Sequence, residues 1–368
     1  MYRILDLLLK VYYNLLVLLR KEGFRKMAFL TNLVNLTKKI YHVGMTVVML
    51  VPLLLTMGMD DIVPTDVIEY ETTNPHIVSY GEMEISAHRS GAGIAPQNTL
   101  MAFEKVLKDN DKFGVDIYEF DVQVTKDGKL IIMHDLTYDA TSNAVEEFGR
   151  ENVYANELTY EEAMVLNMGE NFQINGEYPY RGLRGKDIPY NLHVPLCEDV
   201  IDYIEKNSGD KKYDYIIEIK SKGEDGKRAA DELQRIIKEK GLVERAIWAS
   251  SKQDVSNYMR DTYPEIQRSA NILEVLQFYI YARMDWDLNL ANVSYSALHI
   301  PYGASAANGL INTGTRQVIN YAHKYNIAAQ YWTINDAEAV EYLAKNGADC
   351  VMTDYPDMAY ETLKNIEF

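Results

Sequence analysis

Two carboxylates, Glu119 and Asp121, stand two residues apart in the apolar run "VDIYEFDVQV" at residues 115–124. On a strand, side chains two residues apart point to the same face. Acids among apolar neighbours need a positively charged partner, and hard cations such as Mg²⁺ or Ca²⁺ take oxygen ligands. Glu218, near the end of "YIIEIK", adds a third carboxylate in the same setting. Together the three acids indicate a metal site, although solvated carboxylates and a surface pair between Glu218 and Lys220 are the alternatives.

Two histidines end apolar runs: His88 closes "EISAH" and His134 closes "KLIIMH". A single histidine of this kind is as readily structural as catalytic, but a pair beside carboxylates would supply an acid and a base near neutral pH. Arg89 could hold a phosphate in a forked geometry. The set fits phosphodiester cleavage, in which a divalent cation neutralises the phosphoryl oxygens, one histidine activates the nucleophile and the other protonates the leaving alkoxide.

Strand-like and helix-like segments alternate through the rest of the chain, which predicts the element that must position these residues. About eight β-then-α units in roughly 285 residues favour a (β/α)₈ TIM-type barrel over an open doubly wound sheet. Chemistry-capable residues at the ends of several strands agree with a barrel. The principal strands are predicted at residues 84–88, 115–124, 130–134, 214–220, 245–250, 297–302, 327–335 and 348–356.

Residues 136–195 do not follow this alternation. They are rich in Tyr, Asn, Glu and Gly and hold at most one convincing helix, "TYEEAMVLN". Long irregular connections inside a compact domain are usually functional or disordered. We therefore predict an insertion that folds over the barrel mouth.

The N-terminal part of the chain differs in charge from the rest. Residues 1–41 carry eight Lys and Arg against two acids, while the whole chain carries a formal charge of −17. Residues 40–59 contain no Asp, Glu, Lys or Arg, which is about the length of a membrane-spanning helix. Because Lys38 and Lys39 precede this run and acids follow it, the N-terminus should be cytoplasmic and the catalytic domain outside. A cleaved signal peptide is the alternative, but the apolar run is long for one.

These observations predict a single-pass membrane protein with four parts. Residues 1–39 form a basic amphipathic segment, either interfacial or a cytoplasmic helical hairpin. A transmembrane helix at 40–59 and a connector at 60–82 follow, and the barrel occupies 83–368. The acidic body argues against a nucleic-acid partner, Cys197 and Cys350 are read as buried thiols, and the oligomeric state is left open.

The motifs occur in an order that resembles the glycerophosphodiester phosphodiesterase family. The set is His88-Arg89, "APQNT", Glu119-x-Asp121, His134-Asp135, "IEIK", "YWTIN" and "TDYP", and the resemblance covers roughly residues 84–368. It implies a TIM-type barrel that hydrolyses glycerophosphodiesters to glycerol 3-phosphate and an alcohol with one divalent cation, Ca²⁺ or Mg²⁺.

The resemblance also implies roles for single residues. His88 and His134 would be the acid–base pair, and Glu119, Asp121 and Glu218 the metal ligands. Arg89 and Lys220 would contact the phosphate. Trp332 would lie at the mouth against the glycerol part of the substrate, with a core aromatic as the alternative reading.

Two positions depart from the family pattern. Ser90 stands where the family has glycine, so Gly91 would supply the flexible position of the turn. Gln97 stands where the family has glutamate, which removes a negative charge near the site.

Membrane-anchored members with a long hydrophobic leader occur in this family. Placed outside the membrane, the enzyme would act on deacylated or lyso-phospholipids or on polyglycerol-phosphate polymers of a cell envelope, and the sequence does not choose among them. Two other functions stay open. One is a phospholipase on the same barrel that forms a cyclic phosphate, and the other is a weakly active, membrane-anchored module that binds envelope polymers.

Overall fold

A computed structural model of the chain describes residues 66–303 and 312–368. The chain divides into two compact units, Met1–Leu55 and Thr56–Phe368, and every described residue belongs to the second. The predicted basic segment and the predicted transmembrane helix at 40–59 lie outside the described residues. Within the described ranges, no helix combines the length and the apolar character needed to cross a membrane.

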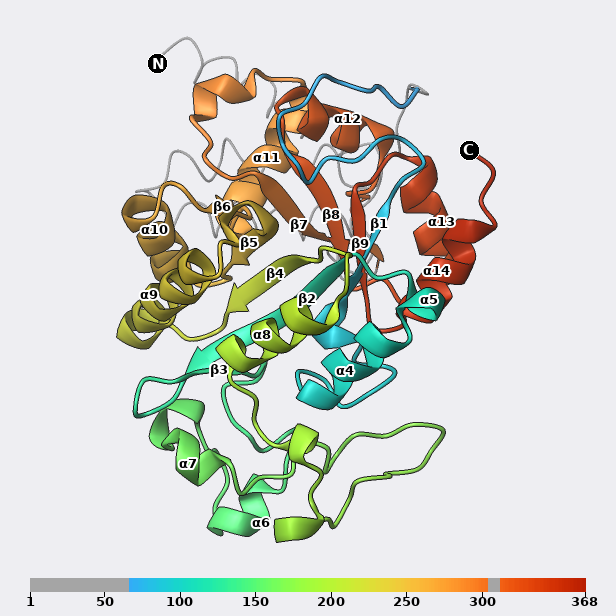
Figure 1. The fold of residues 1–368 in the computed structure, drawn as a ribbon. Helices are drawn as coiled ribbons and strands as arrows, with labels where there is room; N and C mark the ends of the chain where they lie inside the picture. The colour runs from blue at the N-terminus through green and yellow to red at the C-terminus, as the bar shows by residue number, and fades with distance from the viewer. Residues whose placement is uncertain (1–65, 304–311) are drawn as a thin grey trace, which may run out of the picture. The chain divides into compact units, whose positions relative to one another are not determined.

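Eight parallel strands form a nearly closed barrel (Figure 1). Neighbours follow the order β6-β5-β4-β2-β1-β9-β8-β7. Ser269, just after β6, bridges in parallel to Ala297 at the start of β7, which brings the two edge strands together. The predicted barrel is therefore confirmed. The strands are β1 (Glu84–Ala87), β2 (Ile117–Val124), β4 (Asp214–Ile219), β5 (Ala246–Ala249), β6 (Gln267–Arg268), β7 (Ala297–Pro301), β8 (Ala328–Trp332) and β9 (Cys350–Thr353).

Helices, most of them amphipathic, cover the outside of the barrel. In α9 (Gly223–Glu239), for example, Ala230, Leu233 and Ile237 are buried. Thr99 caps the N-terminus of α4, which begins at Leu100, since its side-chain oxygen accepts a hydrogen bond from the Ala102 amide. The other covering helices are α4 (Leu100–Lys108), α5 (Asn110–Phe113), α8 (Cys197–Asn207), α10 (Gln253–Thr262), α11 (Ile272–Met284), α12 (Arg316–Lys324), α13 (Ala337–Lys345) and α14 (Pro356–Lys364).

The described part of the connector, residues 66–82, packs at the N-terminal end of the barrel (Figure 1). Asn74 donates hydrogen bonds to the carbonyls of Ser296, directly before β7, and Asn326, two residues before β8. Ile77 packs against a cluster inside the barrel that includes Ile117 and Ile216. The connector therefore closes the end of the barrel opposite the ends of the strands where the predicted site residues lie.

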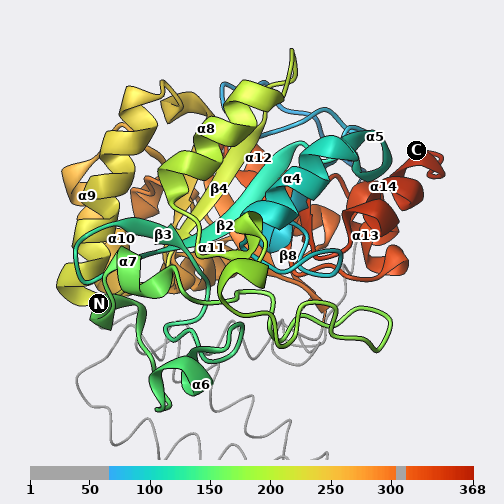
Figure 2. The same ribbon diagram turned by 60° about the horizontal axis from the view of Figure 1, so that its bottom comes forward.

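The insertion is a small folded unit on a β-hairpin. Beyond Asp121, β2 pairs antiparallel with β3 (Leu130–Ile132). The predicted helix is one turn, α7 (Tyr160–Ala163), because its regular hydrogen bonding stops at Met164, and a second short helix, α6 (Ala144–Phe148), was not predicted. Figures 1 and 2 show the insertion beyond the C-terminal end of β2. Its apolar cluster contains Ile131, Met133, Tyr138, Ala144, Val153, Ala155, Leu158, Ala163, Leu166, Met168 and Val194.

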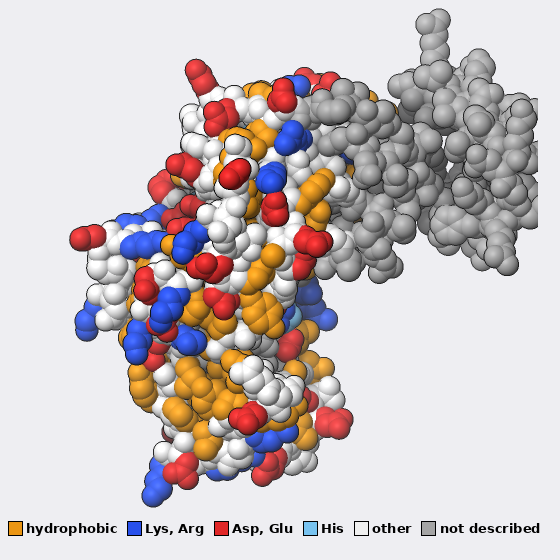
Figure 3. All heavy atoms as spheres, turned by 90° about the vertical axis from the view of Figure 1, so that its right-hand side faces the viewer, with side chains coloured by type: hydrophobic (Ala, Val, Ile, Leu, Met, Phe, Trp, Pro, Cys, Tyr) orange, Lys and Arg blue, Asp and Glu red, His pale blue; other side chains and the backbone are white. Residues whose placement is uncertain are grey.

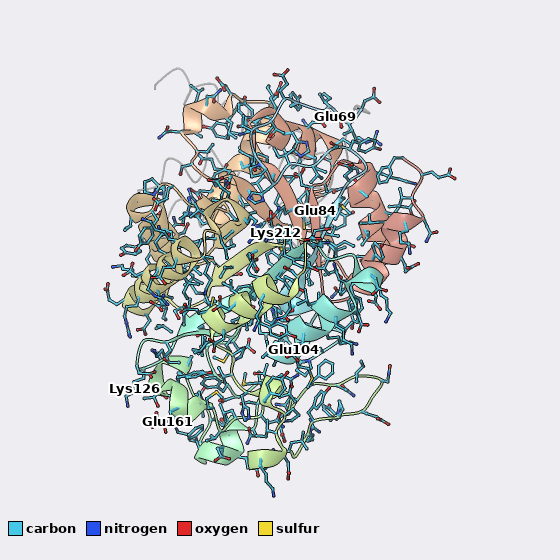
Figure 4. All side chains as sticks on the ribbon, in the orientation of Figure 1. Glu69, Glu84, Glu104, Lys126, Glu161 and Lys212 are labelled. Carbon is cyan, nitrogen blue, oxygen red and sulfur yellow. The ribbon has the colours of Figure 1, made fainter. Side chains whose placement is uncertain are left out.

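Glu104 on α4 ties the barrel to the insertion. Its carboxylate accepts hydrogen bonds from the Tyr190 hydroxyl and, at 2.6 Å, from Asn191 Nδ2. In Figure 4 the Glu104 label lies between α4 and the insertion.

Acidic and basic side chains are interspersed over the part of the surface drawn in Figure 3. Both cysteines are buried and unpaired, as predicted.

Candidate active site

The barrel register brings the predicted acids and His88 together at one end of three adjacent strands. Ala87, the last residue of β1, pairs with Tyr118 on β2, so His88 lies level with Glu119. Two residues further along β2, Asp121 is the register partner of Glu218 on β4. Residues far apart in the sequence are therefore neighbours at the C-terminal end of the barrel, where TIM-barrel active sites lie.

The β2–β3 hairpin adds the second histidine. Because β3 runs back along β2, the amide of Met133 donates a hydrogen bond to the Asp121 carbonyl at 2.8 Å. His134 follows directly and its charge acts on Asp121. If β2 ended level with the neighbouring barrel strands, no hairpin would form and His134 would not be brought beside Asp121.

Lys220 lies between two of the three acids. Its Nζ atom is 3.0 Å from Asp121 Oδ1 and 2.8 Å from Glu218 Oε2. Burial alone would lower the pKa of Lys220, but the two carboxylates outweigh it and the pKa is raised. Burial likewise opposes ionisation of Asp121, yet Lys220 and the neighbouring cations lower its pKa. Asn98 Nδ2 also donates to Asp121 Oδ2 at 2.9 Å, so Asp121 is held as a carboxylate.

Of the three acids, Glu119 is the one whose negative charge has no ion pair with Lys220. It is 4% exposed, and its Oε2 atom accepts a hydrogen bond from the Arg89 amide at 2.7 Å. Burial, together with the charge of Asp121, raises the pKa of Glu119 to about 7. A buried carboxylate pair of this kind would be stabilised by a further positive charge.

The donor chemistry of this site fits a hard divalent cation. Three carboxylates supply the oxygen ligands that Mg²⁺ and Ca²⁺ prefer, and Glu119 is buried beside the like charge of Asp121, so that its pKa is raised. Among the described residues, however, no three His, Cys, Asp or Glu side chains are grouped closely enough to hold a metal ion. The ammonium of Lys220 stands between Asp121 and Glu218 instead, so a shared cation requires Lys220 to move.

Each histidine is held through the same ring atom. His88 Nδ1 is 2.7 Å from Asp354 Oδ1, and His134 Nδ1 is 2.8 Å from Asp135 Oδ1. These contacts leave Nε2 of each ring for a substrate. Burial would lower the pKa of His88, but the Asp354 hydrogen bond and the charge of Glu119 raise it above its ordinary value.

Asp354 and Asn335 are site residues to which the sequence assigned no role. Asn335 Nδ2 donates to Asp354 Oδ2 at 2.7 Å, and Asn335 Oδ1 accepts from the Asp354 amide at 2.9 Å. The two residues follow β8 and β9, inside the motifs "YWTIN" and "TDYP". The sequence shows that both residues follow strand ends. It does not show that Asp354 contacts His88 or that Asn335 contacts Asp354.

The turn after β1 sets the position of Arg89. Arg89, Ser90 and Gly91 all have positive φ, at 48°, 60° and 85°. Gly91 takes the left-handed conformation as expected, and Arg89 and Ser90 also have positive φ. The Arg89 side chain donates from Nη1 to Gln97 Oε1 at 2.7 Å.

Trp332 ends β8 and is 38% exposed. This exposure is inconsistent with a core aromatic. Its contact with the glycerol part of a substrate stays a prediction.

Fold and site together define a class of protein. A barrel of this type with acids, histidines and cations at its C-terminal end has the architecture of TIM-barrel enzymes. Residues 88–358 match the glycerophosphoryl diester phosphodiesterase family. The chain belongs to this family and is a phosphoric diester hydrolase.

Individual relatives agree with this assignment. A glycerophosphodiester phosphodiesterase of Caldanaerobacter subterraneus is 28% identical over 283 residues, covering 77% of this chain and 96% of the relative. A phosphodiesterase of Oleispira antarctica, solved with the product sn-glycerol 3-phosphate, superposes with a TM-score of 0.56 at 18% identity, covering 77% of this chain and 97% of the neighbour. A glycerophosphodiester phosphodiesterase of Agrobacterium tumefaciens gives 0.52 at 18% identity, with 75% and 98% coverage. At these identities, the two solved structures establish the fold.

Proposed function

We propose that the protein hydrolyses glycerophosphodiesters to glycerol 3-phosphate and an alcohol, with His88 and His134 as the acid–base pair and one divalent cation as cofactor. The observation that carries this proposal is the matched pair of His–Asp contacts beside Glu119 and Asp121. His88 interacts electrostatically with Glu119, and His134 with Asp121. The glycerol 3-phosphate bound to the Oleispira antarctica phosphodiesterase supports the same product here.

The reaction requires two proton transfers. One histidine takes a proton through Nε2 from water as its oxygen attacks phosphorus. The bond between phosphorus and the alcohol oxygen breaks, and the other histidine donates a proton to the departing alkoxide. Asp354 and Asp135 fix the orientation of the rings through Nδ1, so neither histidine has to rotate into place.

The remaining residues bind and orient the phosphate. Glu119, Asp121 and Glu218 would hold a Mg²⁺ or Ca²⁺ ion, which supplies charge neutralisation for the phosphoryl oxygens when bound. Arg89 offers a guanidinium donor to the phosphate. Lys220, displaced from between the acids, would donate to the same group, and Trp332 would pack on the glycerol part.

A panel of diesters tests the proposal. Glycerophosphocholine, glycerophosphoglycerol, a lyso-phospholipid and a polyglycerol phosphate are incubated with the full-length protein, with and without chelator. Release of glycerol 3-phosphate that the chelator abolishes is expected. No turnover of any diester would favour the binding module.

Isotope labelling separates hydrolysis from cyclisation. Direct hydrolysis in H₂¹⁸O places ¹⁸O on phosphorus in the first product. A cyclic phosphate would form without solvent oxygen, so an unlabelled first product would contradict the proposal and favour the cyclising phospholipase.

Residues 40–59 are proposed to anchor the enzyme in a membrane, with the barrel outside and residues 1–39 in the cytoplasm. The charge-free run and the lysines before it support this topology. Protease added outside intact cells should digest the barrel, and a variant lacking residues 1–39 should still sediment with membranes. Full protection of the barrel, or loss of sedimentation in that variant, would contradict this topology or the sufficiency of residues 40–59.

A further inference from the structure

The guanidinium of Arg89 is held by a neutral group. Nη1 donates to the amide oxygen of Gln97 at 2.7 Å. Nε is buried without a hydrogen-bond acceptor among the described residues. The nearest carboxylate to Nε is that of Asp121, whose Oδ2 atom is 3.8 Å away and outside hydrogen-bond range.

The two site cations beside Asp121 are therefore neutralised to different degrees. Lys220 makes close ion pairs with both Asp121 and Glu218. Arg89 makes none as close, and the same Asp121 is already engaged by Lys220 and Asn98. Because Gln97 accepts from Nη1 and Nε is buried, Nη2 is the guanidinium nitrogen of Arg89 that can donate to an anion.

We propose that Gln97 is a specificity-determining residue: it holds Arg89 in place without neutralising it, and so selects for a doubly charged phosphate over a singly charged one. A glutamate here would pair with Arg89 and neutralise its charge. Losing that positive charge would weaken the binding of a phosphomonoester dianion more than that of a phosphodiester monoanion, because the Coulomb energy scales with the ligand's charge. This inference rests on the proposed phosphate-binding site.

The variant Gln97→Glu tests the inference because it is isosteric and changes only the charge. The full-length protein is titrated calorimetrically at pH 8 and fixed Mg²⁺ with glycerol 3-phosphate, a dianion at this pH, and with dimethyl phosphate, a monoanion. We expect the dissociation constant for glycerol 3-phosphate to rise about tenfold and that for dimethyl phosphate about threefold. Equal changes for both ligands, or no change, would overturn the inference.

Two further variants separate the charge of residue 97 from its packing and from its distance to the ligand. Gln97→Ala removes the hydrogen bond to Arg89 without adding charge. It should raise the dissociation constants for both anions by the same factor. In an Arg89→Met background, Gln97→Glu should change the ratio of the two affinities by less than twofold. If the full selectivity change persists without Arg89, residue 97 acts directly on the ligand and the inference is wrong.

The experiment does not depend on turnover, since neither ligand needs to be hydrolysed. If no diester is cleaved but the selectivity shift appears, the proposed activity fails and the inference stands. If diesters are cleaved and the shift is absent, only the inference fails. A wild-type protein that binds neither anion would overturn the inference as well.

Discussion

Nδ1 of His88 lies 2.7 Å from Oδ1 of Asp354, and the other oxygen of Asp354 accepts a hydrogen bond from Asn335. This chain of contacts joins the ends of β1, β8 and β9, so His88 is oriented by parts of the barrel far from it in the sequence. Asp354 also raises the pKa of His88 against the effect of burial. Orientation and proton affinity of the proposed catalytic histidine therefore both depend on Asp354.

Asp354→Asn should reduce kcat by about 10²-fold with little effect on KM, because it disturbs a proton transfer rather than substrate binding. The pKa of His88 should fall in the same variant, since the favourable contact with a negative charge is lost. An NMR titration of the His88 ring protons measures that shift.

Asp357→Asn is the matched control, because Asp357 is exposed on the adjoining helix α14. It should retain wild-type kcat. An Asp354→Asn enzyme with normal kcat, or an unchanged pKa of His88, would contradict the role assigned to Asp354.

The residues that the sequence identified share one property. His88, Glu119, His134 and Glu218 are polar residues in or directly after apolar runs, and a parallel barrel gathers such positions at one end. Once they lie together, two histidines and several carboxylates favour acid–base and metal-assisted chemistry. Fold class and the main site residues were predictable for this reason.

Other parts of the site depend on geometry that the sequence does not express. The contacts of Asp354 and Asn335 depend on the side-chain conformations and relative positions of three strand ends. The position of Lys220 between two acids follows from competition among charges, and the left-handed conformation of Arg89 and Ser90 is rare for residues other than glycine. The insertion packs its own apolar cluster through irregular segments, which no period of two or 3.6 reveals.

Stability should depend on pH through Glu84 at the N-terminal end of the barrel (Figure 4). Burial, with Asp116, Asp214 and Asp349 nearby, raises the pKa of Glu84 from 4.5 to about 8. Between these values the folded state binds more protons than the unfolded state, so the free energy of unfolding falls as pH rises from about 4.5 to 8.

Glu84→Gln removes this penalty and should stabilise the protein at pH 9 by about 1–3 kcal/mol, with little effect at pH 4.5. Urea unfolding of the full-length protein at the two pH values measures the difference. The exposed neighbour Glu82, changed to Gln, serves as control. A Glu84→Gln gain that is the same at both pH values would show that Glu84 does not titrate as described.

The two thiols should be unreactive in the native protein. Cys197 and Cys350 are each 0% exposed, and burial raises the pKa of both thiols, which suppresses the reactive thiolate. A thiol reagent should label neither residue in the native protein and both after unfolding. Rapid labelling without denaturant would contradict the packing around them.

Glu104→Ala should loosen the insertion, because the Tyr190 hydroxyl and Asn191 amide lose their acceptor on α4. Limited proteolysis should cut within residues 136–195 several times faster, while unfolding of the barrel changes little. Glu161→Ala, at an exposed position on α7, provides the control. Equal cleavage rates in the two variants would mean that the Glu104 contacts do not hold the insertion.

The most direct test of the central claim is the initial rate of glycerol 3-phosphate release from glycerophosphoglycerol with Mg²⁺ or Ca²⁺. Wild-type protein is compared with His88→Asn and His134→Asn. A wild-type rate that falls by about 10²-fold or more in each variant, and that chelation abolishes, is the predicted result. A rate that is unchanged by either substitution, or that is the same with and without the chelator, would contradict metal-dependent catalysis by two histidines.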